Sequence, residues 1–211
     1  MKILIVSATL YEIESLFDNN QFENLEITTL ITGVGMTSTT YSLTKTLIEN
    51  KFDLAINLGL AGSFDRTIEL GNVVNITTDT FSELGAEDGG DFIKLKDLGL
   101  NDPKFDEEIT NNNSTELISI NQLRKVSGIT VNKVHGNENS ILEVKKHCDP
   151  DVESMEGAAF LYVCQQENLP CYQIRAISNY VEKRSKENWK IEDSIKNLHN
   201  FAVQLLNELK S

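Results

Sequence analysis

Short apolar runs alternate with longer amphipathic stretches along most of the chain. Residues 3–6 are apolar at every position, which is typical of a strand buried on both faces and therefore of a parallel sheet. Further strands are expected at residues 25–31, 53–57, 71–77, 129–134 and 171–177. Helices are expected at residues 36–50, 138–146 and 156–168. The alternation predicts an α/β fold, a three-layer αβα sandwich with a mostly parallel central sheet, formed by one domain over residues 1–211.

The clearest periodicity lies near the C-terminal end of the sequence. Apolar residues recur there at steps of three and four, at Ile191, Ile195, Leu198, Ala202, Leu205 and Leu209. This spacing predicts a helix with one apolar face. We interpret that face as core, packed on the sheet.

Glycine-containing segments follow two of the predicted strands. Gly33-Val34-Gly35 lacks the third glycine of a dinucleotide-binding fingerprint, because Ser38 stands at its position, so a tight strand-to-helix turn is expected. Gly59-Leu60-Ala61-Gly62 ends the strand at residues 53–57, either as a plain turn or as backbone that a ligand approaches closely. The polar region from Phe81 to Asn113 predicts loops, with a segment that moves over the site as one alternative.

Composition narrows the classes of partner. The net charge of −13 argues against binding to nucleic-acid phosphates and to anionic membranes. Three cysteines, Cys148, Cys164 and Cys171, have no metal-ligand spacing, and a reducing cytoplasm is their simplest compartment. The apolar run at residues 3–6 is too short for a signal sequence, and no stretch is long enough to span a bilayer.

Three charged residues stand where predicted elements begin or end. Glu156 opens the helix at residues 156–168, either to complement the helix dipole or as an acid at the edge of a cleft. Glu12 follows the first strand at the sheet edge where α/β proteins bind ligands, or is a solvated acid beside Glu14. Arg175 closes an apolar strand, where an unpaired charge would be costly. We expect Arg175 to hold a site carboxylate or a water, with a structural ion pair as the rival interpretation.

Several motifs together resemble the purine nucleosidase and phosphorylase superfamily. They are Glu12, Asn57 with Gly59–Gly62, Met155-Glu156 and Arg175–Asn179. Within that superfamily the sequence is similar to the futalosine hydrolases of menaquinone biosynthesis, and methylthioadenosine/adenosylhomocysteine nucleosidases are close to them. The more specific motifs are Phe81–Asp88 (FSELGAED), Val152–Ala159 (VESMEGAA), and Ser178-Asn179 followed by Arg184 and Trp189-Lys190-Ile191.

The resemblance implies a nucleoside phosphorylase-like fold and hydrolysis of an N-ribosidic bond that releases hypoxanthine. It also implies a small purine nucleoside as substrate and a homo-oligomer, with a dimer favoured. No metal-ligand cluster is visible in the sequence, and this chemistry requires no cofactor. Ala61 and Gly62 then belong to the substrate-binding site. One departure is Leu60, since related adenosine-type nucleosidases carry there a Ser that helps to place the attacking water.

The chemistry of this bond accounts for the residue types. The transition state gives the sugar positive charge, so Glu156 suits both the 2′ and 3′ hydroxyls and that charge. Glu12 is the candidate base that activates water, and Arg175 would fix that water. Met155 would pack against the sugar, or is a core thioether.

Asn179 distinguishes the substrates that the resemblance leaves open. Adenine-releasing nucleosidases carry an Asp there that protonates N7. An Asn amide instead donates to O6 of a 6-oxopurine and accepts from a protonated N7, which favours hypoxanthine as the leaving base. As an alternative, Asn after a strand is an ordinary turn residue.

Residues 7–20 contain no basic residue and three acidic ones, Glu12, Glu14 and Asp18. Carboxylates there would repel phosphate, so water is the expected nucleophile. The benzoate of futalosine calls for a cation, and Lys183, Arg184 and Arg66 are the candidates.

The purine calls for a flat partner, for which Phe81 and the segment from Val131 to His135 are candidates. His135 could also be a structural histidine. Three competing hypotheses stay open at this point: a methylthioadenosine/adenosylhomocysteine nucleosidase, a phosphorylase, and a catalytically inactive nucleoside-binding module.

Overall fold

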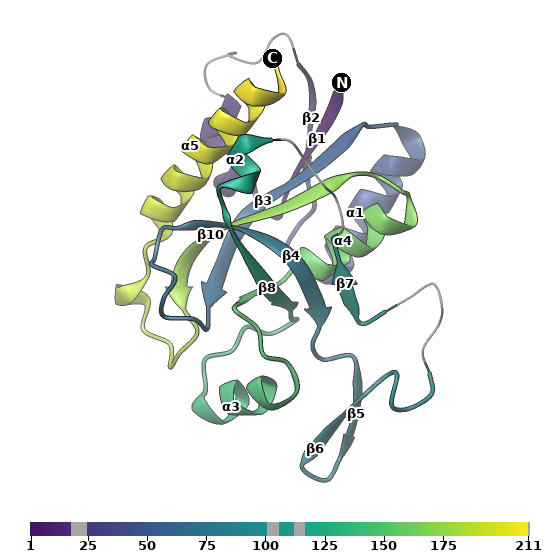
Figure 1. Cartoon of the computed structure of the whole chain (residues 1–211), viewed down its shortest axis with the longest axis vertical. Coiled ribbons are helices and arrows are strands. Elements are labelled where there is room, and N and C mark those ends of the chain that lie inside the picture. The colour runs from purple at the N-terminus through teal and green to yellow at the C-terminus, as the bar shows by residue number, and fades with distance from the viewer. Residues whose placement is uncertain (18–24, 101–105, 112–116, 211) are drawn as a thin grey trace.

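The computed structural model describes residues 1–17, 25–100, 106–111 and 117–210. Its main sheet has eight strands, which Figure 1 shows at the centre of the molecule. They are β1 (Lys2–Ser7), β2 (Glu26–Ile31), β3 (Leu54–Ser63), β4 (Val73–Phe81), β7 (Glu108–Thr110), β8 (Arg124–Thr130), β9 (Val152–Ser154) and β10 (Cys171–Tyr180). Asp18, one of the three acids counted after the first strand, lies outside the described residues.

The strand order is β10-β4-β8-β9-β3-β1-β2, with β7 beside β4. An additional pairing of β10 with β3 closes five strands into a ring. The sheet is mixed, since β10 with β4, β3 with β9 and β4 with β7 are antiparallel pairs. The predicted α/β class is confirmed, whereas the predicted mostly parallel sheet is not, because these antiparallel contacts between distant segments leave no pattern in the sequence.

Helices lie on both sides of β1 and β3 (Figure 1). On one side are α5 (Ile191–Leu209) and the short α2 (Ile118–Asn121), and on the other are α1 (Met36–Glu49) and α4 (Gly157–Gln166). The remaining helix, α3 (Glu138–His147), lies apart from these strands, where Val144 packs against Ile129 of β8. Successive residues of β1 alternate between two cores, because side chains on a strand point to opposite faces. Ile3 and Ile5 pack in the α5 core, while Leu4 and Val6 pack in the core of α1 and α4.

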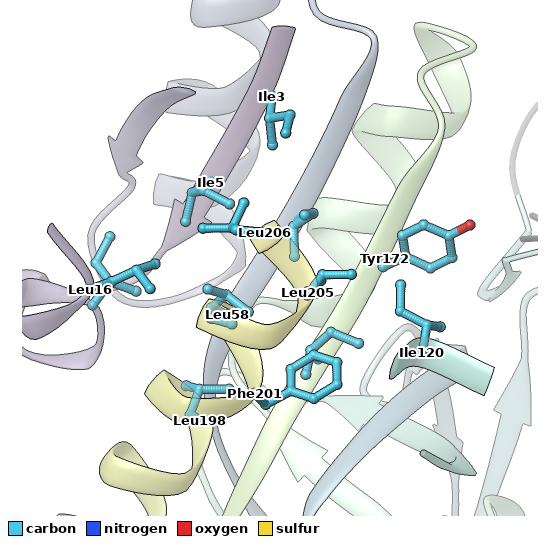
Figure 2. Packing of buried hydrophobic residues seen from close by; sticks show 14 of the residues in the cluster. Ile3, Ile5, Leu16, Leu58, Ile120, Tyr172, Leu198, Phe201, Leu205 and Leu206 are labelled. Carbon is cyan, nitrogen blue, oxygen red and sulfur yellow. The ribbon is translucent and has the colours of Figure 1, made fainter. Parts of the chain in front are cut away.

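Figure 2 shows the core under α5, where leucines of the helix face residues of β1, β3 and β10. Leu198, Ala202 and Leu205 are buried there, which confirms that the apolar stripe of the last helix is core. Phe201 and Leu206 widen that stripe. The packing holds α5 against the same three strands whose carboxyl ends carry the site described below.

Most predicted elements are present, but the limits of several strands and the content of one predicted loop region differ from the prediction. Gly59–Gly62 does not end a strand, because β3 continues to Ser63 by pairing with β10. The predicted strand at residues 129–134 is β8, which already ends at Thr130. The described part of the region predicted as loops, residues 81–100 and 106–111, contains β7 and a two-stranded hairpin of β5 (Gly85–Asp88) with β6 (Asp91–Lys94). The rest of that region, residues 101–105 and 112–113, lies outside the described residues.

Candidate active site

A pocket of about 240 Å³ opens where β1, β3 and β10 end. These three strands are mutually parallel, so their carboxyl ends meet at one edge, as is usual for ligand sites in α/β folds. The lining residues are Ala8, Thr9, Glu12, Val34, Leu60, Ala61, Gly62, Val134, His135, Glu153, Ser154, Met155, Glu156, Ser178, Asn179, Tyr180, Glu182, Lys183, Arg184, Ser185 and Trp189. Among the predicted site residues, the pocket therefore brings together Glu12, Ala61, Gly62, His135, Met155, Glu156 and Asn179.

Glu12 is held at the pocket wall by hydrogen bonds to both carboxylate oxygens. It ends a 3₁₀ turn (Leu10–Glu12) directly after β1. Its Oε2 accepts from Ser7 Oγ at 3.0 Å, from Thr9 N at 2.9 Å and from Thr9 Oγ1 at 3.0 Å. Its Oε1 accepts from the backbone N of Leu60 at 3.2 Å. Leu60, which stands where related nucleosidases carry a Ser, thus contacts Glu12 through its backbone N–H.

Glu156 is the N-cap of α4 and is only 6% exposed. Its Oε1 accepts a hydrogen bond from Gly35 N at 3.0 Å, and its Oε2 lies 3.9 Å from Arg175 Nη2. Gly35 has φ +96°, a conformation that L side chains rarely adopt, so glycine is required to aim this N–H at the acid. The tight turn predicted around Gly33 and Gly35 therefore has a function in the site.

Arg175 is fully buried and does not line the pocket. Its Nη2 donates to Asn57 Oδ1 at 2.5 Å, while its Nη1 has no hydrogen-bond partner among the described residues. A Cβ at Gly59 would lie 2.1 Å from Nη1 and 3.1 Å from Glu12 Oε1. Gly59 therefore leaves room for the guanidinium, and Nη1 and the Glu12 carboxylate flank the same point of the backbone.

A second buried acid, Asp79 of β4, lies beyond Arg175 and was not identified from the sequence. Burial raises the pKa of its carboxyl to about 6, although hydrogen bonds from Gln173 and Thr130 and the charge of Arg175 oppose the rise. Asp79 lies beyond the strand predicted at residues 71–77, and nothing near it in the sequence indicated burial, because only the fold brings it next to Gln173 of β10.

Asn179 follows a β-bulge in β10, where the register to β3 shifts after Ile177. Its Oδ1 accepts from Ser178 Oγ at 2.9 Å, and its Nδ2 donates to the Tyr180 carbonyl at 3.0 Å. An amide oxygen accepts two hydrogen bonds and an NH₂ donates two, so each group retains one for a ligand. Asn179 thus lies within a strand that reaches the pocket, and not in the turn of the alternative interpretation.

His135 and Glu153 form a pair in the pocket wall. The His135 ring Nδ1 lies 2.7 Å from Glu153 Oε2, and His135 N donates to Glu153 Oε1 at 3.0 Å. When Nδ1 donates to the carboxylate, Nε2 of the neutral ring is an acceptor. His135 therefore pairs with Glu153, as a structural histidine would, and also lines the pocket. Glu153 was missed from the sequence, although it stands three residues before Glu156 in the same motif.

Two of the three candidate cations belong to the pocket. Lys183 and Arg184 line it, and the Arg184 guanidinium carbon lies 4.9 Å from the centre of the Trp189 ring. Arg66 does not line the pocket: it pairs with Glu182 and stacks over Tyr180 at 4.5 Å.

Phe81 also lies outside the pocket, contrary to the prediction that it contacts the purine. It lines separate hollows beside α1, with Met36 and Thr40. Phe81 is the last residue of β4, and it packs partly against the core of α1 and α4. The flat side chains that do line the pocket are Tyr180, Trp189 and His135, of which the first two were not predicted as stacking partners.

The sequence profile of the phosphorylase superfamily matches residues 19–210. A futalosine hydrolase of Thermus thermophilus is 25% identical over 185 residues, which cover 85% of this chain and 80% of the relative. A 5′-methylthioadenosine/S-adenosylhomocysteine nucleosidase of Bacillus subtilis is 30% identical over 174 residues, covering 80% and 74%. The solved structure of a Helicobacter pylori futalosine hydrolase shares the fold, with a TM-score of 0.84 at 16% identity over 99% of this chain and 98% of that chain.

Membrane-spanning helices and metal clusters are both missing from the described ranges. No helix there is long and apolar enough to cross a membrane. No group of three or more His, Cys, Asp or Glu side chains there is placed to hold a metal ion.

Proposed function

The chain belongs to the phosphorylase superfamily and is an N-glycosyl hydrolase, and we propose that it hydrolyses the N-ribosidic bond of futalosine, releasing hypoxanthine and dehypoxanthine futalosine for menaquinone biosynthesis. The observation that carries this proposal is that Asn179 lines the pocket and keeps one Nδ2 N–H and one Oδ1 lone pair for a ligand. Those two groups complement O6 and a protonated N7 of a leaving 6-oxopurine.

The reaction places charge where the site can balance it. The Glu156 carboxylate accepts from the 2′ and 3′ hydroxyls and stabilises the developing cation on the sugar. Gly35 N holds one of its oxygens, which orients the acid without neutralising it. Met155 packs against the ribose, and Ala61 and Gly62 provide a flat backbone surface beside it.

Water is the nucleophile in this proposal. Glu12 takes its proton, and Arg175 Nη1, a buried donor without a partner among the described residues, fixes its oxygen from the side of Gly59. The pocket residues that follow β1 are Ala8, Thr9 and Glu12, with no cation among them to hold a phosphate co-substrate.

Lys183 and Arg184 favour futalosine over methylthioadenosine. Both are exposed at the pocket, and neither forms an ion pair among the described side chains. Two neighbouring cations that line a pocket, in a protein with a net charge of −13, form a local positive site that suits a carboxylate. The benzoate of futalosine supplies one, whereas methylthioadenosine has no charge to offer.

The experiment that tests the proposal measures base release from futalosine, its 6-amino analogue and methylthioadenosine, each with and without phosphate. Hypoxanthine release from futalosine without phosphate is the expected result. Preferential adenine release would favour the methylthioadenosine/adenosylhomocysteine nucleosidase, supported by the Bacillus subtilis relative. A need for phosphate would indicate a phosphorylase, and binding without base release an inactive nucleoside-binding module.

Replacing Asn179 by Asp should shift specificity toward 6-amino substrates. A protonated Asp donates to N7 of adenine but lacks the amide N–H that O6 of hypoxanthine requires. We expect the ratio of kcat/KM for futalosine to that for its 6-amino analogue to fall by roughly tenfold or more. An unchanged ratio contradicts the assignment. Asn188→Asp, an exposed change outside the pocket, is the matched control.

Replacing Lys183 and Arg184 together by Gln should raise KM for futalosine by roughly tenfold, because two charge-assisted contacts to the benzoate are lost. The kcat/KM for an uncharged purine nucleoside should stay the same. Lys186→Gln changes an exposed cation outside the pocket and is the control. Equal effects on charged and uncharged substrates would show that the two cations do not recognise the carboxylate.

We also propose a homo-oligomer, with a dimer favoured, in the cytoplasm. Exposed apolar side chains on α1, Tyr41 and Ile48, flank the hollow that also contains Phe81, and such a surface suits a second copy of the chain. Sedimentation velocity distinguishes this from a monomer. Cys148, Cys164 and Cys171 form no disulfide, which supports a reducing compartment.

A further inference from the structure

A continuous network of buried hydrogen bonds runs behind the pocket from Thr130 through Arg175 to Asn57. Thr130 Oγ1 donates to Asp79 Oδ1 at 2.9 Å, and Gln173 Nε2 donates to Asp79 Oδ2 at 3.0 Å. Arg175 Nε then donates to Gln173 Oε1 at 3.4 Å, and Arg175 Nη2 to Asn57 Oδ1 at 2.5 Å. All five side chains are buried, and none of them lines the pocket.

Asp79 sets the direction in which the hydrogen bonds of this network are donated. An ionised carboxylate only accepts hydrogen bonds, so Gln173 must turn its Nε2 toward Asp79. Its Oε1 is then obliged to face Arg175, whose guanidinium only donates. If the amide were reversed, Nε2 would face Arg175 Nε, donor against donor, and the guanidinium would lose its acceptor on that side.

The start of α4 closes over the two residues that set this polarity. A Cβ on Gly157 would lie 2.0 Å from Gln173 Oε1 and 2.1 Å from Asp79 Oδ2, so only glycine leaves them room. The next residue, Ala158, donates its N–H to Thr130 Oγ1 at 2.7 Å. Glu156 immediately precedes Gly157, so the helix start that carries the pocket acid also contacts the network.

We propose that Asp79 and Gln173 are positioning residues, which hold the Arg175 guanidinium so that its free Nη1 faces the attacking water beside Glu12. This rests on the proposed function in one respect, the role of Arg175 toward water. Asp79 touches no substrate, and its effect passes through the orientation of the Gln173 amide.

Protonation of Asp79 should disrupt this relay, the hydrogen bonds through which Asp79 and Gln173 orient Arg175. The charged groups that face it are Arg175 of β10 and Glu156 before α4, while its neighbours Thr130 and Gly128 in β8 and Ile109 in β7 are uncharged. Because burial brings the pKa of Asp79 to about 6, the neutral acid forms near that pH and can then donate to Gln173 Oε1. The reversed amide would no longer accept from Arg175, so kcat should fall on the acid side.

The same carboxyl affects stability in the opposite direction from activity. Its folded pKa of about 6 lies above the ordinary 3.8, so between these values the folded chain binds a proton that the unfolded chain does not. Stability contributed by this proton is therefore lost as the pH rises through that window. Replacing Asp79 by a neutral residue should therefore not lower the melting temperature at neutral pH. If the carboxylate served only to stabilise the fold, the same replacement would lower it.

The test compares Asp79→Asn, Gln173→Glu and the double variant, assayed on whichever nucleoside the wild-type enzyme cleaves. Asp79→Asn frees the Gln173 amide to reverse, and we expect kcat to fall by roughly 10- to 100-fold with little change in KM. In the double variant, the carboxylate introduced at position 173 again offers Arg175 an acceptor. The amide introduced at position 79 donates to that carboxylate, and the number of buried charges is the same as in the wild type. We expect the double variant to recover most of kcat and to lose the acid limb near pH 6.

Asp79→Asn with wild-type kcat, or a double variant no better than the single one, would overturn the proposal. If Asp79→Asn does not fold, the test is the comparison of kcat between the double variant and the wild type. A near-normal kcat of the double variant supports the relay, and a low kcat refutes it. Because the assay uses the substrate that is actually cleaved, a wrong assignment of futalosine does not affect the outcome.

Discussion

Replacing Glu12 by Gln is expected to lower kcat by roughly 10²- to 10⁴-fold, the range typical of a lost general base. An amide cannot take a proton from water. It also fits poorly among the donors that surround the carboxylate, because Ser7, Thr9 and the Leu60 backbone N supply four hydrogen bonds that a carboxylate accepts on two oxygens. The measurement is the single-turnover rate of base release at saturating substrate.

Glu14→Gln is the matched control, since Glu14 lies two residues further along the chain and is exposed. We expect it to leave the rate unchanged. A substrate-binding test on the Glu12→Gln variant separates catalysis from binding: the Kd should change far less than kcat. If the Glu12→Gln rate equalled that of the control, Glu12 would not be the base.

Replacing Glu156 by Gln is expected to lower kcat by roughly 10²- to 10³-fold, the scale on which preorganised electrostatic contacts act. The introduced amide keeps an oxygen for the Gly35 N–H, so the side chain should stay in place. It loses the negative charge that we propose balances the cationic sugar, and such a charge matters more in the transition state than in the bound substrate. The loss should therefore appear in kcat more than in KM.

The control for this variant is Glu167→Gln, which changes the exposed residue at the other end of α4. Turnover of a substrate that lacks one ribose hydroxyl gives a second measurement. A 2′-deoxy nucleoside lacks one of the two hydroxyls that we propose Glu156 binds, so the wild type and Glu156→Gln should differ less on it than on the ribonucleoside. Near-normal turnover of the ribonucleoside by Glu156→Gln would contradict the assignment.

Local sequence was enough to identify the residues that stand at strand and helix ends. Glu12, Glu156 and Asn179 each follow a short apolar run or open a helix, and parallel strands bring such ends to one edge. The stripe of α5 was equally clear, because a helical period of apolar residues depends only on neighbours along the chain.

Contacts between distant segments were not accessible in this way. The continuation of β3 through Gly59–Gly62 depends on its pairing with β10, more than a hundred residues away. The antiparallel pairs within the ring, β10 with β4 and β3 with β9, also join segments far apart in the sequence, and the position of Phe81 outside the pocket likewise depends on the tertiary structure. Local propensity does not encode which strand becomes a neighbour.

The sequence by itself therefore determined the α/β class, the order of most elements and the acids and amide that line the pocket, since these follow from local periodicity and from residue chemistry. Only the tertiary structure decided that Arg175 stands behind the pocket, that Lys183 and Arg184 line it while Arg66 does not, and that Asp79 and Gln173 reach Arg175. The physical reason is that burial and hydrogen-bond partnership are properties of three-dimensional neighbours, which closure of the sheet brings together from segments far apart in the chain.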